Sequence, residues 1–244
     1  MISFFKKLRH QLLHENKLSK YLIYAIGEII LVVIGILIAL QINNWNNKRL
    51  LKADEQKSYL DIKRQITSDK NELLKVKAYN DYYSKAYEYA NKIIISGDRS
   101  RVDSLALISM TLSQYSDFHR SGNIYETLVN SGDLKLLKNS GITSALQQLE
   151  MTYNFANKLE DIHWEIIINE LSPELRGTIN YTTYKAVKPE KLFGVEIQNI
   201  FYESIYLTKA KDSIYKRALS EIETLTDLIN KETGTSVSDG DYRL

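Results

Sequence analysis

Histidine and glutamate are the residues of this sequence whose spacing could support metal or acid–base chemistry. Glu160 and His163 form a Glu-x-x-His pair, which is half of the ligand set that ferritin-like bundles use for two metal ions. That centre needs a second such pair, and none occurs after residue 42. His10 and His14 lie four residues apart, a helical metal spacing, but no third ligand accompanies them. We therefore expect no metal ion and no cofactor.

Other catalytic chemistry also lacks its residues. The chain has no cysteine, which excludes disulfides, thiol catalysis and cysteine-ligated metals. No Walker-type Gly-Lys-Ser/Thr or glycine fingerprint follows a strand pattern, so no phosphate-binding loop is predicted. The carboxylate pairs Glu221/Glu223 and Asp54/Glu55 fit solvated helix positions, and His119 stands alone. We expect a protein that is not an enzyme.

One carboxylate, Glu28, is the single formal charge in the apolar stretch Tyr21–Ile42, YLIYAIGEIILVVIGILIALQI. A transmembrane helix needs about 20 mostly apolar residues, and a single segment can cross only as a helix because its backbone must bond internally. A core helix is usually shorter and keeps a polar face. No small-x-small cleavage site follows, so the stretch is expected to remain as an anchor. Tyr21 and Tyr24 at one end and Trp45 at the other fit the aromatic belts of the two membrane interfaces.

Glu28 shares one side of the predicted span with small residues. At about 100° per residue, that side carries Ala25, Glu28, Val32, Gly35 and Ala39. Gly35-x-x-x-Ala39 is a small-xxx-small pair, which lets two helices approach closely, and a carboxylate at this depth is costly unless it meets a partner or water. We predict that this face contacts a second copy of the chain or a partner membrane protein. Snorkelling of Glu28 to the headgroups and proton handling are the alternatives.

Charge predicts the orientation of the anchor. The net charge is +2, but residues 1–20 hold five Lys/Arg and one Glu, so the remainder is −2. Residues 2–14 form an amphipathic pattern, typical of a helix lying on anionic lipid. Long domains translocate largely regardless of charge, while a short basic tail resists crossing. We expect a cytoplasmic N-terminus and a domain at 43–232 in the periplasm, with the inner-membrane bilayer as a partner and without nucleic acid.

The opening of the chain resembles an uncharacterised bacterial family of single-pass membrane proteins. The similar segment is KYLIYAIGEIILVVIGILIALQINNWN at residues 20–46, preceded by FFKKLRHQLLHENKLS. Two further short stretches match, Tyr125–Leu128 and Ser131–Leu134. The resemblance implies an N-terminal anchor followed by a helical domain, and it supplies no activity or catalytic residue.

Two long heptad-like seams predict that the domain is an antiparallel helical bundle, so the fold class is all-α. The first seam, within 43–95, is Ile62, Ile66, Asp69, Leu73, Val76, Asn80, Tyr83, Tyr87, Ala90 and Ile94. The second, within 195–232, is Ile197, Phe201, Ser204, Thr208, Lys211, Tyr215, Ala218, Ile222, Leu225 and Ile229. Asp69 and Asn80 either set the register of the bundle or mark a hinge.

The segments between the seams predict shorter elements. Four Ser-Gly turns in 96–141 separate short helices, each turn with Gly closing one helix and Asp or Asn capping the next. Residues 142–171 predict a long amphipathic helix with His163 on its core face. Both prolines lie in 172–194, which predicts a helix break with a short strand and a variable binding surface. The tail 233–244 is expected to be disordered.

Five tyrosines cluster between residues 79 and 89. We expect Tyr83 and Tyr87 in the core, and Tyr79, Tyr82 and Tyr89 at the surface, where exposed rings could bind a partner. Without catalytic residues, the sequence favours a membrane-anchored scaffold or interaction protein. The alternative is an extracytoplasmic sensor or ligand-binding bundle that acts through a membrane partner, with the ligand unknown.

Overall fold

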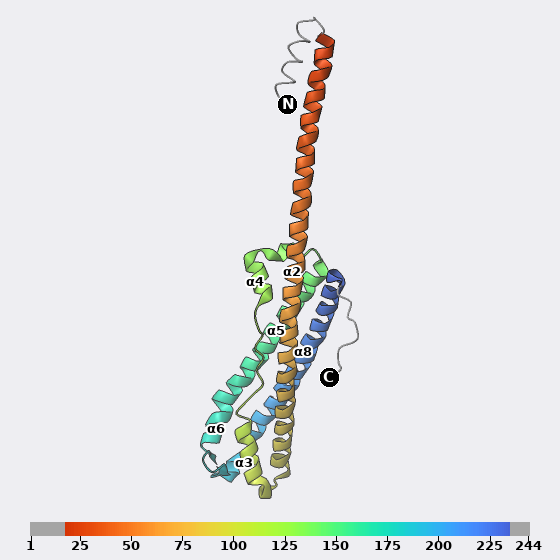
Figure 1. Ribbon diagram of the computed structural model, residues 1–244. Coiled ribbons are helices and arrows are strands. Elements are labelled where there is room, and N and C mark those ends of the chain that lie inside the picture. Colours follow the sequence, from red (N-terminus) through yellow and green to blue (C-terminus); the bar gives the residue numbers. More distant parts are fainter. Residues whose placement is uncertain (1–17, 235–244) are drawn as a thin grey trace. The chain divides into compact units, whose positions relative to one another are not determined.

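The computed structural model describes residues 18–234, which are almost entirely helical (Figure 1). The described elements are α2 (Leu18–Ser96), η1 (Arg99–Arg101), α3 (Val102–Thr111), α4 (Ile124–Ser131), η2 (Asp133–Leu136), α5 (Ser140–Ile166), η3 (Ile167–Leu171), α6 (Ser172–Arg176), β1 (Ile179–Asn180), β2 (Lys185–Ala186), α7 (Pro189–Leu192) and α8 (Val195–Thr233). The all-α class is confirmed. The predicted interfacial helix at 2–14 and most of the tail lie outside the described residues.

The chain divides into two compact units, with the boundary between Asp54 and Glu55. The described part of the first unit is the beginning of α2, whose apolar side chains are exposed. The second unit contains the rest of α2 and all the later elements. Its core is therefore built entirely from side chains after residue 54.

Three long helices form the second unit, and their contacts fix their directions. Contacts from α2 to α8 descend along α8 as they ascend α2: Lys63 bonds Asn230, Lys70 pairs with Glu223, and Lys77 pairs with Asp212. These two helices are antiparallel, as predicted. By contrast, α2 and α5 are parallel, because Glu55 bonds the backbone before α5 and Tyr87 meets His163 near its end.

The parallel pair differs from the predicted antiparallel bundle because of residues 112–123, which we call the strap. The strap connects α3 to α4 without a helix and returns the chain along the unit, so that α5 starts again at the end where α2 enters (Figure 1). The heptad patterns describe helix faces and carry no information about such a return.

Every residue of the two predicted seams is buried, which confirms both helix faces. The apolar members fall into two clusters. One contains Tyr59, Leu73 and Ile222, and the other contains Tyr87 and Phe201. Asp69, Asn80 and Lys211 are the polar and charged interruptions that most need explaining, since a buried charge is costly unless it is paired and hydrogen-bonded.

The predicted turn chemistry holds at two of the four Ser-Gly pairs. Gly97 and Gly132 adopt the left-handed conformation, with φ of 65° and 75°, which a residue without a Cβ enters at little cost. The prediction is wrong for Gly122, which lies in the strap, and for Gly141, which lies in the first turn of α5. There the cap is Asn139, whose side chain accepts from the Gly141 and Ile142 N–H groups.

The helix break predicted at Ser172 occurs later, after Arg176. The wide π-turn η3 precedes Pro173, and a wider turn accommodates a proline ring that would otherwise meet the carbonyl four residues earlier. The predicted short strand is confirmed as a hairpin of two residues per strand, with Ile179 opposite Ala186.

Candidate functional site

The predicted membrane-helix face lies on the first unit and is open. Glu28, Val32, Gly35 and Ala39 are exposed, and Ala25 is half-buried. Nothing described lies within 4 Å of a Cβ built on Gly35. Because all five residues belong to α2, their spacing places them on one side of that helix. The face therefore has room for another helix.

The predicted interfacial aromatics flank the same segment. Trp45 is 64% exposed, and the Arg49 guanidinium lies 5.7 Å from the centre of its ring. Tyr24 is half exposed, and the side chain of Tyr21 lies outside the described part. An exposed indole beside an arginine suits the polar–apolar boundary of a bilayer.

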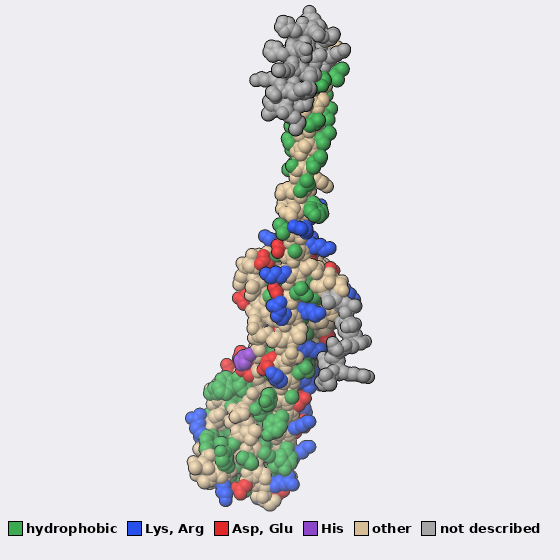
Figure 2. Space-filling model, viewed as in Figure 1, with side chains coloured by type: hydrophobic (Ala, Val, Ile, Leu, Met, Phe, Trp, Pro, Cys, Tyr) green, Lys and Arg blue, Asp and Glu red, His purple; other side chains and the backbone are tan. Residues whose placement is uncertain are grey.

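The predicted tyrosine surface is confirmed as exposed, and Tyr83 and Tyr87 are buried as expected. The Tyr89 hydroxyl accepts a hydrogen bond from Arg101 at 2.7 Å, whereas Tyr79 and Tyr82 are the more exposed rings. Figure 2 shows hydrophobic side chains gathered over the part of the second unit that holds α3, and more charged side chains toward α4. The half of the unit around α3 thus presents the larger apolar surface.

A buried polar cluster joins the three long helices at His163. Lys211 Nζ of α8 lies 3.1 Å from His163 Nδ1, and the Tyr87 hydroxyl of α2 lies 3.3 Å from His163 Nε2. His163 and Lys211 are completely buried. Lysine has no acceptor, so Nδ1 accepts from Lys211 and the proton of a neutral His163 resides on Nε2.

Glu160 lies one helical turn before His163 and organises the other half of this cluster. Its carboxylate accepts hydrogen bonds from the Tyr215 hydroxyl, from Asn157 Nδ2 at 2.9 Å and from the Phe118 backbone N–H at 3.0 Å. Glu160 is 1% exposed. The carboxylate is saturated with donors and holds α8 and the strap against α5.

Burial moves the pKa values of these groups toward their neutral forms. It lowers the pKa of His163 to about 3, and the neighbouring Lys211 charge acts in the same direction. Burial lowers the pKa of Lys211 to about 8, opposed by Glu160 and Asp117. The pKa of Glu160 is raised by burial, although its bonds to Tyr215 and Asn157 oppose the shift. At neutral pH the cluster therefore contains a neutral imidazole between charged neighbours.

Side chains, rather than a helix or sheet, hold the central backbone of the strap. Lys211 donates to the Ser116 carbonyl at 3.1 Å and Asn157 donates to the Phe118 carbonyl at 3.0 Å. Asp69 accepts from both the N–H and the hydroxyl of Ser121, each at 2.9 Å. Buried peptide groups need such partners. The polar seam residue Asp69 thus anchors a crossing segment, and so does Asn80, which accepts from the Ser116 hydroxyl at 3.1 Å.

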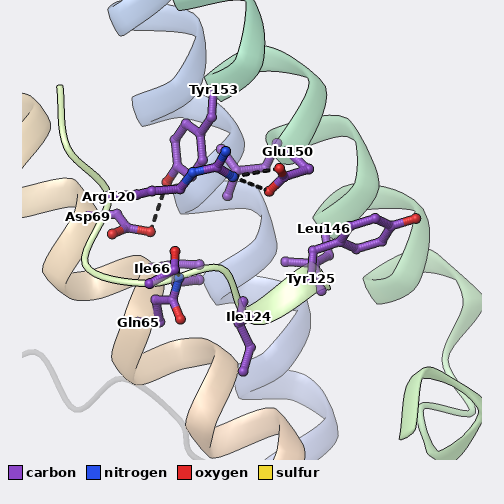
Figure 3. A pocket seen from close by; sticks show the side chains of 11 residues that line it. Gln65, Ile66, Asp69, Arg120, Ile124, Tyr125, Leu146, Glu150 and Tyr153 are labelled. Carbon is purple, nitrogen blue, oxygen red and sulfur yellow. Dashed lines mark hydrogen bonds and ion pairs between the residues drawn. The ribbon is translucent and has the colours of Figure 1, made fainter. Parts of the chain in front are cut away.

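A small cavity adjoins the strap where it passes α2 and α5 (Figure 3). Its volume of about 10 Å³ is near the minimum that one water molecule requires. Figure 3 shows Arg120 directed at Glu150, and Asp69 bonded to the Tyr153 hydroxyl. These polar groups satisfy one another, so the cavity gives no room for a small-molecule ligand.

The remaining histidines are not gathered into a site. His119 projects from the strap, with its side chain 82% exposed and its Nε2 3.0 Å from Asp117. His10 and His14 lie outside the described residues. Within residues 18–234, no three His, Cys, Asp or Glu residues are placed to hold a metal ion. Glu160 and His163 bond to other partners.

Sequence patterns alone missed the cluster, although one signal was available. Asn80 and Lys211 are polar residues at seam positions, and His163 was placed on the core face of α5. Three polar core positions on three helices are consistent with one shared layer. The strap residues Ser116 and Phe118 carried no comparable signal, because their contribution is largely through backbone groups.

Comparisons with known proteins give a family without an assigned activity. A family described as "Family of unknown function (DUF6090)" matches residues 28–202. One of the chains of the ATP-dependent helicase/deoxyribonuclease of Clostridium tetani (strain Massachusetts / E88) is 28% identical over 192 residues, covering 75% of this chain. The match spans only 16% of that protein's length. No solved structure matches.

Proposed function

We propose, for a chain that belongs to the DUF6090 family of unknown function, that it is a non-enzymatic scaffold or interaction protein anchored in a bacterial inner membrane. The observation that carries this proposal is the apolar part of α2. Of the described helices, α2 alone contains a segment long and apolar enough to cross a bilayer, and that segment is unburied. Burial on folding cannot account for its composition, whereas insertion in lipid can.

The proposed arrangement places the N-terminal residues in the cytoplasm, one transmembrane helix at 21–42, and the helical domain in the periplasm. The short basic tail and the long domain support this orientation. A basic interfacial helix at 2–14 would lie on the cytoplasmic leaflet. The positive charge is concentrated at this tail, which supports lipid rather than nucleic acid as its partner.

The orientation is tested with reporters fused after Leu244. We expect a reporter that is active only outside the cytoplasm to be active, and a cytoplasmic reporter at the same site to be inactive. The same pair fused before Met1 is the internal control and should show the reverse pattern. Reversal of the activities at Leu244 would place the domain in the cytoplasm and contradict the proposed orientation.

The interaction role rests on two surfaces. One is the open face of α2 around Glu28 and Gly35, proposed to meet a second copy or another membrane helix. The other is the surface formed by Tyr79, Tyr82 and Tyr89, proposed to meet a protein partner. Crosslinking of the intact protein in mild detergent should recover defined oligomers or partners, and recovery of monomer only would contradict a scaffold role.

A sensor function is the second candidate, favoured by the buried cluster beneath the strap. Its charged and neutral groups are held 3.1–3.3 Å apart and out of contact with water. The cavity beside Asp69 holds one water at most, so a small organic ligand is not the input that this cluster supports.

A further inference from the structure

The strap covers the buried cluster through Tyr115. Its ring packs edge-on against the His163 ring, with centres 6.0 Å apart, and Lys211 Nζ lies 5.5 Å from the Tyr115 ring centre. On its other side Tyr115 stacks on Trp164 at 5.3 Å. The helices enclose the cluster elsewhere, so displacement of the strap is the route to water that leaves the helix ladders intact.

His163 is surrounded by groups that require it to be neutral. Lys211 and Tyr215 face this region from α8, Tyr87 faces it from α2, and Glu160 lies on α5 itself. The strap contributes Tyr115 and Asp117, whose charge acts on Lys211. A second proton on His163 would occupy Nδ1, the atom that accepts from Lys211. It would also place two buried cations 3.1 Å apart, which is strongly unfavourable in a site without water.

We propose that the strap is a proton-sensitive cover, which opens when His163 is protonated while α2, α5 and α8 remain packed. Between Tyr115 and Gly122 the described hydrogen bonds to the strap backbone come from side chains. Opening exchanges these bonds for bonds to water and hydrates the imidazolium. Separating the helices would also expose two apolar core clusters, so the local route costs less.

The size of the response follows from proton linkage. Burial beneath the strap holds the pKa of His163 at about 3, against an ordinary value of 6.5 when it is hydrated. The closed form thus binds this proton only at low pH and the open form binds it below about 6.5. The equilibrium constant for opening should rise as pH falls, by up to about tenfold per pH unit between these values.

The test uses the full chain in detergent micelles with hydrogen exchange between pH 7 and 4.5, corrected for the intrinsic pH dependence. We expect the protection of amides 115–122 to fall by up to about tenfold per pH unit, while the core amides of α5 and α8 stay protected. Trp164 reports the same event by fluorescence in a Trp45→Phe background, because opening separates it from Tyr115.

His163→Gln and His119→Gln are the matched variants. Glutamine retains a donor and an acceptor at position 163 but cannot be protonated in this range, so the acid response should disappear. His119 lies on the strap itself and is exposed, so His119→Gln should keep the response. An unchanged response in His163→Gln would overturn the proposal. In the wild type alone, simultaneous loss of strap and helix protection would show global unfolding, and unchanged strap protection down to pH 4.5 would show no cover; either result also overturns it.

Discussion

At the scale of single residues, Lys211 shows what a polar seam position contributes to this domain. The heptad pattern places it toward the core, and it is completely buried there. Its ammonium group bonds a strap carbonyl and His163, with Glu160 nearby as the counter-charge. Such buried ionic groups add little net stability because desolvation offsets their attraction. Their clearest effect here is to specify where the strap crosses.

The stability of the domain should carry a signature of Lys211 at alkaline pH. Burial holds its folded pKa at about 8, below the ordinary 10.5. A lowered lysine pKa contributes stability above the unfolded pKa and loses it as pH falls through the folded pKa. The free energy of unfolding of the wild type, minus that of Lys211→Met, should therefore increase by up to about 3 kcal/mol from pH 8 to 10.5.

Denaturant unfolding at several pH values measures this difference. Lys209→Met is the control, because Lys209 is an exposed member of the same helix, paired with Glu88 at 2.8 Å. Its substitution should change stability by less than about 0.5 kcal/mol. A difference between wild type and Lys211→Met that falls with rising pH would contradict the assigned direction of the Lys211 shift.

At the scale of elements, the strap is stabilised by individual side chains of α2. Asp69 is 1% exposed, and one of its oxygens binds both the N–H and the hydroxyl of Ser121. The polar residue left open by the heptad pattern, as a register device or a hinge, is thus an anchor for a distant backbone segment. A helix ladder cannot supply such bonds, because its own peptide groups are already paired.

Asp69→Ala should destabilise the domain by roughly 1–3 kcal/mol, since it leaves buried donors of Ser121 without an acceptor. Asp61→Ala is the matched change on the same helix. Asp61 is 37% exposed in its side chain and pairs only with the neighbouring Arg64 among the described ion pairs, so its loss should cost under about 1 kcal/mol. Urea unfolding compares the two, and equal losses would show that the Ser121 contact is unimportant.

The first part of α2 gives a separate prediction about association in the membrane. Gly35→Leu should block close approach of a second helix by bulk, and Glu28→Leu should remove a polar contact. Interhelical polar contacts contribute about 0.6–2 kcal/mol, so each change should weaken association by up to roughly tenfold or more. The oligomer fraction in detergent or bilayers measures this.

The opposite face of the same segment supplies the controls for this association experiment. Leu substitutions at Ile30 and Val33 change apolar side chains that are also exposed, so they should leave the oligomer fraction nearly unchanged. Equal association in all four variants would show that Glu28 serves lipid headgroups or another protein, and that the self-interface is wrong.

At the scale of the whole molecule, anchoring and folding reside in different units. Both apolar core clusters lie after residue 54. The exposed apolar stretch lies before it. A protein beginning at Glu55 should therefore be soluble without detergent and retain its helical circular dichroism, whereas the full chain should sediment with membranes. Aggregation of the shortened protein with loss of helicity would show that the first unit is needed for folding.

The sequence by itself determined the long helices, their buried faces and the exposed apolar segment, because each follows from a local period in side-chain polarity. Only the tertiary structure decided the parallel course of α5 and the partners of the buried polar groups. Asp69 meets Ser121 52 residues away, Glu160 meets Phe118 at 42, and Lys211 meets Ser116 at 95. Each of these contacts joins a side chain to a backbone N–H or carbonyl. Because nearly every residue carries both groups, no sequence pattern marks the partner in advance.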